Sequence, residues 1–171
     1  NRGLSNTPLV MLRTGVACKL VEANTELRPY KLKVFDGYRP RAVQHALFIA
    51  TCDEFSSLYP EYSAEEIRDL ARKYVADPNR PGRIPPHATG GAVDLTLLDE
   101  RGFECDMGTG FDCNEEKSAA LYFEQAGQNE VVRRHRQRLR ETLVKLGFRP
   151  NPDEWWHFDW KDWRQYRIGN T

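Results

Sequence analysis

Two of the four histidines in this sequence stand at short distances from carboxylates. His87 comes seven positions before Asp94, and Glu154 comes three positions before His157. A catalytic zinc takes about three protein ligands and keeps one position open, and imidazole nitrogen together with carboxylate oxygen suits it. The residue types and spacing therefore predict a zinc site, with one ion per chain, on His87, Asp94 and His157.

Glu154 is the candidate general base of this site. If residues 154–157 were fully extended, residues three apart would point to opposite faces, so Glu154 could reach the metal only across a bend. Pro152 and Asp153 directly precede it and favour such a bend. From there Glu154 would take a proton from the attacking water and pass it to the leaving amine.

The elements that must position these residues alternate between helical and strand patterns. Gly90 and Gly91 let the chain fold tightly enough for His87 and Asp94 to face one metal. Apolar periodicity predicts helices over residues 15–27, from 41 onward, from 63 to before 77, over 115–126 and over 129–146, and strands over 32–35, 92–97 and 155–160. Strands separated by helices of uneven length indicate one α+β domain that occupies residues 1–171.

Composition argues against a nucleic-acid partner. Lysine plus arginine number 25 and aspartate plus glutamate number 25, so the formal net charge is zero and no nucleic-acid partner is expected. We interpret the densest basic run as the solvated face of an amphipathic helix. The run comprises Arg133, Arg134, Arg136, Arg138 and Arg140.

No apolar run approaches the roughly 18 residues that a membrane span needs, which predicts a soluble domain. The chain starts at Asn1 rather than at methionine, as a chain would whose leader had been removed. Both a cytoplasmic and a periplasmic location therefore stay open, as does the oligomeric state.

The four cysteines form no CxxC pair, which argues against a zinc ribbon or a thioredoxin-type centre. Cys105 and Cys113 could pair across a turn, but unpaired thiols are at least as compatible with the spacing. Each also lies next to an aspartate, so the two cysteines and their aspartates could form a rival metal site. No histidine is close to them in the sequence.

Four separated blocks carry a family resemblance. They are Phe35–Pro40 (FDGYRP), His87–Leu97 (HATGGAVDLTL), Met107–Asp112 (MGTGFD) and Glu154–His157 (EWWH). In these blocks and in their order the chain resembles the D-alanyl-D-alanine dipeptidases of the VanX type. These belong to the LAS (M15) group of zinc metallopeptidases, which also contains carboxypeptidases and hedgehog-like domains.

The resemblance implies a central antiparallel sheet flanked by helices, and hydrolysis of D-Ala-D-Ala or a related short D,D-dipeptide from peptidoglycan. It implies the same roles for His87, Asp94, His157 and Glu154 that the residue types suggest. It further implies that Arg39 stabilises the tetrahedral intermediate, a role that suits the paired hydrogen bonds of a guanidinium.

By the same resemblance Asp112 would bind the free amino group of the dipeptide. A buried carboxylate there would limit the length of the substrate, since an acylated amine would leave its charge unpaired. An exposed turn aspartate is the alternative interpretation.

The sequence departs from the family just before His87. Pro85-Pro86 stand where family members carry serines that meet the substrate carboxylate, and proline offers neither a hydroxyl nor an N–H. Arg83 or backbone groups would have to take over that contact. Two other functions remain open: a carboxypeptidase or endopeptidase that acts on peptidoglycan stem peptides, and a zinc-binding hedgehog-like domain without catalysis.

Overall fold

The centre of the protein is a four-stranded antiparallel sheet with the strand order β1-β2-β4-β3. The computed structural model describes residues 9–80, 84–113, 115–125 and 127–160. The strands are β1 (Lys31–Asp36), β2 (Ala92–Leu98), β3 (Phe148–Pro150) and β4 (His157–Trp160). This confirms the expected α+β class and the antiparallel sheet; the short β3 has no counterpart among the predicted strands.

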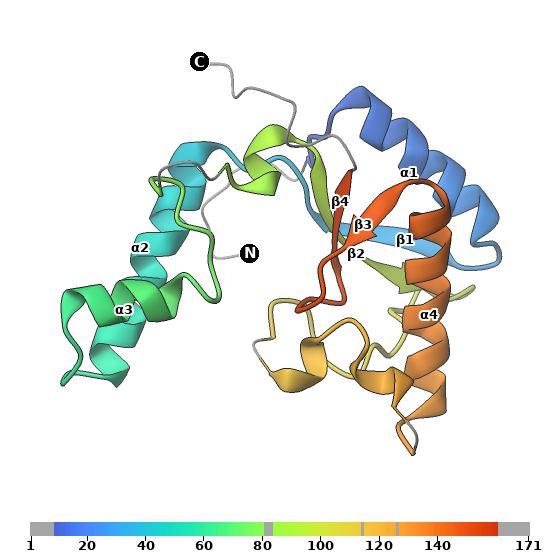
Figure 1. Ribbon diagram of the computed structural model, residues 1–171. Helices are drawn as coiled ribbons and strands as arrows, with labels where there is room; N and C mark the ends of the chain where they lie inside the picture. The colour runs from blue at the N-terminus through green and yellow to red at the C-terminus, as the bar shows by residue number, and fades with distance from the viewer. Residues whose placement is uncertain (1–8, 81–83, 114, 126, 161–171) are drawn as a thin grey trace.

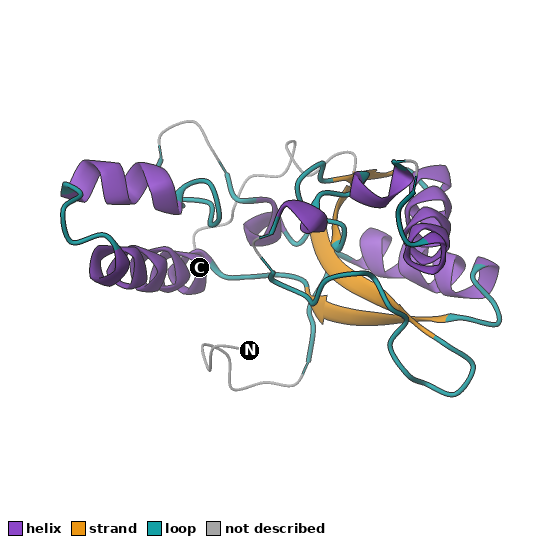
Figure 2. Ribbon diagram, turned by 90° about the horizontal axis from the view of Figure 1, so that it is seen from below, coloured by secondary structure: helices purple, strands orange, loops and turns teal. Residues whose placement is uncertain are grey.

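The helices divide into two groups around this sheet. They are α1 (Thr14–Glu26), α2 (Arg41–Leu58), α3 (Ala64–Ala71) and α4 (Glu130–Lys145), with 3₁₀ helices η1 (Pro86–Thr89), η2 (Glu116–Ser118) and η3 (Tyr122–Glu124). Figures 1 and 2 show α1 and α4 beside the sheet, while α2 and α3 form a pair that stands apart from them. Among the described residues, no helix has the length and apolar character to cross a membrane.

The central strand β2 separates the core from the site. Val93, Leu95 and Leu97 belong to the hydrophobic core together with apolar residues of α1 and α4. Because side chains alternate along a strand, Asp94 points to the other face of the sheet. Its neighbours on that face are buried as well. The fold thus places the Asp94 carboxylate in a protected position on the face away from the core.

Local signals in the sequence mark several boundaries correctly. Ser63 caps α3: its hydroxyl accepts from the Glu66 N–H, and the Glu66 carboxylate accepts from the Ser63 N–H. Gly147 follows α4 with φ of 94°, a conformation that glycine adopts without a steric penalty. The helices predicted from residues 15, 41, 63 and 129 are all present.

The helix predicted over residues 115–126 is wrong. The described part of this segment contains only the two short 3₁₀ helices, because tertiary contacts take its backbone groups. The carbonyl of Ser118 accepts from the Trp155 N–H at 2.9 Å, and the carbonyls of Lys117 and Ala119 accept from Arg136. Carbonyls that are held in this way cannot build a regular α-helical ladder.

Arg136 also corrects the interpretation of the basic run as a solvated face. Only 3% of its surface is exposed. Its guanidinium donates to the carbonyls of Met107, Lys117 and Ala119 and lies over the Phe123 ring. Burial lowers the pKa of Arg136 to about 10. This arginine therefore fastens residues 107–119 to α4.

The four cysteines are all free thiols. Cys105 and Cys113 do not pair with each other, so the first of the two possibilities for these residues is wrong. Metal-compatible clusters in the described part of the chain do not include either of them.

Candidate active site

Three side chains from separate elements meet on the face of the sheet that points away from the core. Asp94 in β2 and His157 in β4 are directly paired across the antiparallel ladder, so their side chains share one face. His87 comes from η1, and Gly90 directly after this helix has φ of 66°. That left-handed residue reverses the chain between η1 and β2, as expected for a glycine at this position.

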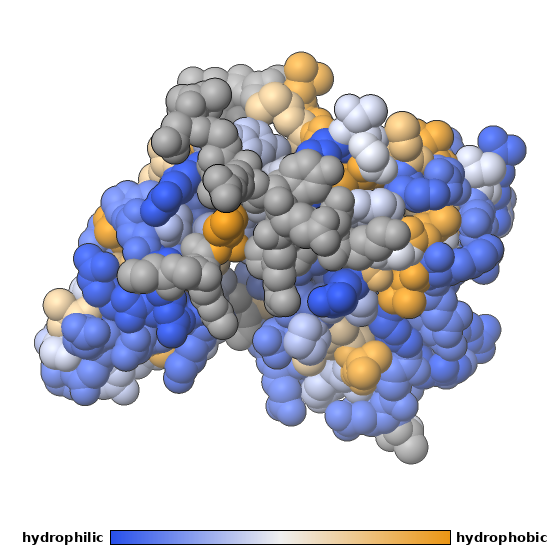
Figure 3. Space-filling model, turned by 45° about the horizontal axis from the view of Figure 1, so that its top comes forward, coloured by the Kyte–Doolittle hydropathy of each residue, from blue (hydrophilic) through white to orange (hydrophobic). Residues whose placement is uncertain are grey.

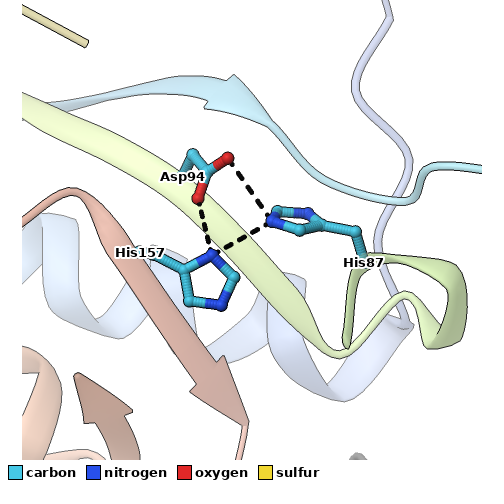
Figure 4. A group of neighbouring side chains, drawn as sticks. All are labelled: His87, Asp94 and His157. Carbon is cyan, nitrogen blue, oxygen red and sulfur yellow. Dashed lines mark hydrogen bonds and ion pairs between the residues drawn. The ribbon is translucent and has the colours of Figure 1, made fainter. Parts of the chain in front are cut away.

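The donor atoms of these three residues converge (Figure 4). His87 Nε2 lies 3.1 Å from His157 Nδ1 and 3.4 Å from Asp94 Oδ2, and His157 Nδ1 lies 3.0 Å from Asp94 Oδ1. All three side chains are buried. Two imidazole nitrogens and one carboxylate therefore form a small cluster of possible metal ligands.

Neighbouring acceptors fix the orientation of both imidazoles. His87 Nδ1 lies 2.7 Å from the carbonyl oxygen of Gly37 and must donate to it, which leaves Nε2 free to accept. His157 Nε2 lies 3.1 Å from Asp159 Oδ1, which leaves Nδ1 for the cluster. Imidazoles that ligate metals commonly donate their second N–H to a carbonyl or carboxylate in this way.

The charges in the cluster depend on one another. Burial alone would raise the pKa of Asp94, but the charges and hydrogen bonds of His87 and His157 hold that pKa well below its ordinary value. Burial alone would lower the pKa of His157, but Asp159 and Asp94 raise it to about 10. Without a metal, the cluster therefore retains a proton on His157 between two carboxylates.

Glu154 lies at the edge of this cluster, in the turn before β4. The strand begins at His157 rather than at Trp155, so the bend that Glu154 requires is present and the strand predicted from Trp155 is two residues too long. Glu154 Oε2 lies 3.8 Å from His157 Nδ1 and accepts from Asn151 Nδ2 at 2.9 Å. Burial raises the pKa of Glu154.

Arg39 also lies next to this cluster. Its guanidinium lies 4.0 Å from Asp94 Oδ2, and it donates from Nε to Asp36 at 2.9 Å and from Nη1 to Gln44 at 3.0 Å. An irregularity in the pairing of β1 with β2 sets Asp36 opposite Asp94. Gln44 is buried and donates in turn to the carbonyl of Ala76.

Asp112 lies on the wall of the same cleft, but its side chain is exposed, so the expected burial is wrong. It adopts φ of 63°, which only a few per cent of non-glycine residues do. The preceding residue holds the loop in place: Phe111 stacks on Phe35 and meets Trp156 edge-on. Backbone strain at a cleft wall is often associated with a functional site.

One cleft of about 300 Å³ joins all the residues that the sequence singles out. His87, Asp94, His157, Glu154, Arg39 and Asp112 all line it. Pro85 and Pro86 form part of its wall beside His87, where they contribute no side-chain donor. Arg83, the other candidate for carboxylate recognition, lies outside the described residues.

Four residues of the site were not predicted. Asp36 and Gln44 hold Arg39, Asn151 holds Glu154, and Asp159 holds His157. Asp159 had a signal in the sequence, because residues two apart in a strand share a face. The other three contacts depend on a bulge, a buried amide and a turn, which residue types alone do not reveal.

The sequence matches known proteins over nearly its whole length. The family model of the M15 peptidases described as D-ala-D-ala dipeptidase matches residues 3–167. The chain is 33% identical to a D-alanyl-D-alanine dipeptidase of Synechocystis sp. (strain ATCC 27184 / PCC 6803 / Kazusa) over 89% of this chain and 70% of that protein. It is 31% identical to a D-alanyl-D-alanine dipeptidase of Escherichia coli (strain K12) over 78% of this chain and 57% of that protein.

Two solved structures are similar in fold. One is a vancomycin-resistance D,D-pentapeptidase VanY in complex with Zn(II), with a TM-score of 0.56, 16% identity, and coverage of 94% of this chain and 82% of that one. The other is VanYB in complex with D-alanine-D-alanine, with a TM-score of 0.56, 17% identity, and coverage of 94% and 86%. With the family match, these findings confirm the predicted fold and the resemblance: the chain belongs to the D-Ala-D-Ala dipeptidase family of the M15 peptidases.

Proposed function

We propose that this protein is a zinc-dependent dipeptidase that hydrolyses D-Ala-D-Ala or a related short D,D-dipeptide. The observation that carries the proposal is the convergence of His87, Asp94 and His157 beside Glu154 in one cleft. The names of two curated relatives, both D-alanyl-D-alanine dipeptidases, supply the substrate class.

The chemistry of the donor set fits zinc. With ligand bonds of about 2.0–2.1 Å, neighbouring ligands of a tetrahedral zinc lie about 3.3 Å apart. The three observed separations between donor atoms are 3.0, 3.1 and 3.4 Å. Three protein ligands at the wall of a cleft also correspond to a catalytic site with an open position, rather than to a closed structural site.

When bound, zinc would polarise the scissile carbonyl and make the attacking water more acidic. Glu154 then serves as the general base: it accepts the proton of the water and delivers it to the leaving amine. Arg39 donates hydrogen bonds to the oxygen on which negative charge develops, from a position fixed by Asp36 and Gln44.

Asp112 serves as the receptor for the free amino group of the substrate. Its carboxylate lines the cleft and is exposed, so it can pair with an ammonium group without prior desolvation. Such an exposed ion pair contributes modestly, so Asp112 orients the peptide and discriminates weakly against acylated amines. This geometry favours short substrates with a free amine. Because the discrimination is weak, carboxypeptidase activity on stem peptides remains the second candidate function.

The proposal is tested by one hydrolysis panel on zinc-reconstituted protein. D-Ala-D-Ala, L-Ala-D-Ala, L-Ala-L-Ala and a stem pentapeptide are incubated separately, and released alanine is measured. We expect D-Ala-D-Ala to be the best substrate and chelation to abolish its hydrolysis. A preference for the pentapeptide would favour the carboxypeptidase, and no hydrolysis at all would favour a zinc-binding domain without catalysis.

Zinc uptake should depend on pH in a defined direction. Since the pKa of His157 is raised to about 10 in the metal-free cluster, this imidazole carries a proton at neutral pH and must lose it to bind zinc. We expect about one proton released per zinc, and an affinity that falls about tenfold per pH unit as the pH decreases from 8 to 6.

Calorimetric titration of zinc in buffers of different ionisation enthalpy measures this release. Asp159→Asn is the informative variant, because it replaces the carboxylate that raises the pKa of His157 with a neutral amide. It should release fewer protons and bind zinc more weakly. Zinc binding that releases no proton would contradict the arrangement of charges derived for this cluster.

A further inference from the structure

Arg39 is attached to the sheet at a single oxygen atom. Its Nε and Nη2 both donate to Asp36 Oδ2, at 2.9 and 2.5 Å, while Asp36 Oδ1 accepts from the Gly37 N–H at 2.7 Å. Two hydrogen bonds that end on one oxygen act as a pivot, because the guanidinium can turn about that atom at little cost. Asp36 alone therefore does not determine where the remaining N–H groups of Arg39 point.

Gln44 supplies the second point of attachment. Its Oε1 accepts from Arg39 Nη1 at 3.0 Å, and Nη1 is the terminal nitrogen that Asp36 does not contact. Only 2% of the surface of Gln44 is exposed. An apolar side chain would serve packing better there, since burial of an amide is unfavourable unless it gains hydrogen bonds. Attachment on both sides of the guanidinium fixes its rotation about Asp36 Oδ2.

The amide of Gln44 is held in one orientation. Its Nε2 donates to the carbonyl of Ala76 at 2.9 Å. In the reverse orientation its NH2 group would face an N–H of Arg39 and its oxygen would face the Ala76 carbonyl, so both hydrogen bonds would be lost. The residue after Ala76 is fixed as well, because Asp77 is buried and pairs with Arg72 at 3.3 Å.

Arg39 is thus held between two parts of the molecule. Asp36 belongs to β1 in the sheet, whereas Ala76 follows α3 in the lobe that α2 and α3 form. Figure 3 shows this lobe, with a mainly hydrophilic surface, beside the larger part of the molecule. Gln44 connects the α2–α3 lobe to the guanidinium of Arg39.

The attachment of Arg39 determines which of its donors stay available. A guanidinium has five N–H groups. Asp36 accepts from two of them and Gln44 from one, so Nη1 and Nη2 each retain one. Nη2 lies 4.0 Å from Asp94 Oδ2, and a guanidinium that turned further would form a direct ion pair with Asp94. That pair would use a donor available to the substrate and would compete with zinc for a candidate ligand.

We propose that Gln44 is a positioning residue for Arg39: it holds the guanidinium away from Asp94 and so keeps one N–H on each terminal nitrogen available to the substrate. This rests on the proposed function, which supplies the substrate and the role of Arg39. Gln44 acts through Arg39 rather than on the substrate, because its amide is buried and its oxygen and nitrogen both bind other groups.

A double-mutant cycle tests whether Gln44 acts through Arg39. Gln44→Met keeps a similar volume and removes both hydrogen bonds. We expect it to lower kcat for D-Ala-D-Ala about tenfold with little change in KM, since displacement of a catalytic group by about 1 Å can cost up to about 10²-fold. In the Arg39→Met background the same change should lower kcat by less than about twofold. Equal losses in both backgrounds would overturn the proposal.

Two further variants separate positioning from stability. Gln44→Glu keeps an acceptor for Arg39 but sets its second oxygen against the Ala76 carbonyl. Its kcat should stay within about threefold of the wild type, while Tm falls by about 3–10 °C. Ile67→Val, at a buried position of α3, is the matched control and should lower Tm by about 1–5 °C without a change in kcat. If kcat follows Tm across all of these variants, the role of Gln44 is structural and the proposal fails.

Zinc affinity provides a readout that needs no substrate. In Gln44→Met the released guanidinium can pair with Asp94, so zinc should bind about three- to tenfold more weakly, as measured by calorimetry. In the Arg39→Met background this loss should disappear, because no guanidinium is left to compete for Asp94.

The two readouts separate this inference from the proposed function. If D-Ala-D-Ala is cleaved and neither cycle shows coupling between Gln44 and Arg39, the inference is refuted and the dipeptidase remains. If no D,D-peptide is cleaved, the proposed function fails and the zinc affinities alone decide. A loss in Gln44→Met that depends on Arg39 then supports the inference, and equal affinity of Gln44→Met and the wild type overturns it.

Discussion

Replacement of Glu154 by glutamine is expected to lower kcat for D-Ala-D-Ala by about 10²- to 10⁴-fold, the contribution typical of a general base. Glutamine has the same shape and its amide oxygen can still accept from Asn151, so the turn before β4 is kept. It cannot take a proton from water. Steady-state kinetics together with metal analysis check the result, and zinc should stay near one per chain because the three candidate ligands are unchanged.

The role of Glu154 as a base also predicts how activity depends on pH. Burial raises the pKa of Glu154, and a general base acts only when it is deprotonated. Activity should therefore fall as the pH falls through this raised pKa, above the value of about 4.3 for a free glutamate. Glu100→Gln, a change in an exposed turn, is the matched control and should keep the wild-type profile. Full activity in Glu154→Gln would remove Glu154 from the mechanism.

Arg39→Lys should lower kcat by about 10²-fold with a much smaller change in KM. A hydrogen-bond donor aimed at the developing oxyanion contributes about 10²–10³ in kcat, and lysine cannot reproduce the fork of a guanidinium. The fork is held by Asp36 and Gln44 and points at Asp94 from 4.0 Å. Separate determination of kcat and KM for D-Ala-D-Ala measures the effect.

Arg41→Lys is the natural control for this change. Arg41 lies two residues further on in the first turn of α2, is exposed, and contacts Asn79 rather than the cleft. It should leave both kinetic constants unchanged. If Arg39→Lys instead raises KM and leaves kcat intact, Arg39 binds the ground state of the substrate and does not stabilise the transition state.

The features that the sequence predicts well all depend on local physics. The capping box at Ser63 and the glycine after α4 act within a few residues, so their effects are visible in the order of residue types. The alternation in β2 likewise follows from strand geometry, and it places Asp94 on one face without reference to any other element. The four family blocks add to this local information, because they contain the candidate metal ligands and Glu154.

The segment 115–126 shows where local reasoning fails. Its residues favour a helix, but Arg136 in α4 and the backbone N–H of Trp155 before β4 donate hydrogen bonds to its carbonyls from outside. Tertiary contacts of this kind override propensity, because the summed hydrogen bonds exceed the small preference of each residue for a helix. No pattern of residue types within the segment predicts these tertiary hydrogen bonds.

The sequence by itself determined which residues could form the candidate site: His87, Asp94, His157 and Glu154, with Arg39 and Asp112 from the family blocks. Tertiary structure alone decided how they are held and what surrounds them. Pairing of β2 with β4 sets two of the donors side by side. The part of the cleft wall next to Arg39 depends on Gln44, which the carbonyl of Ala76 after α3 holds in place. Such distances arise between residues far apart in the chain, and spacing along the sequence carries no information about them.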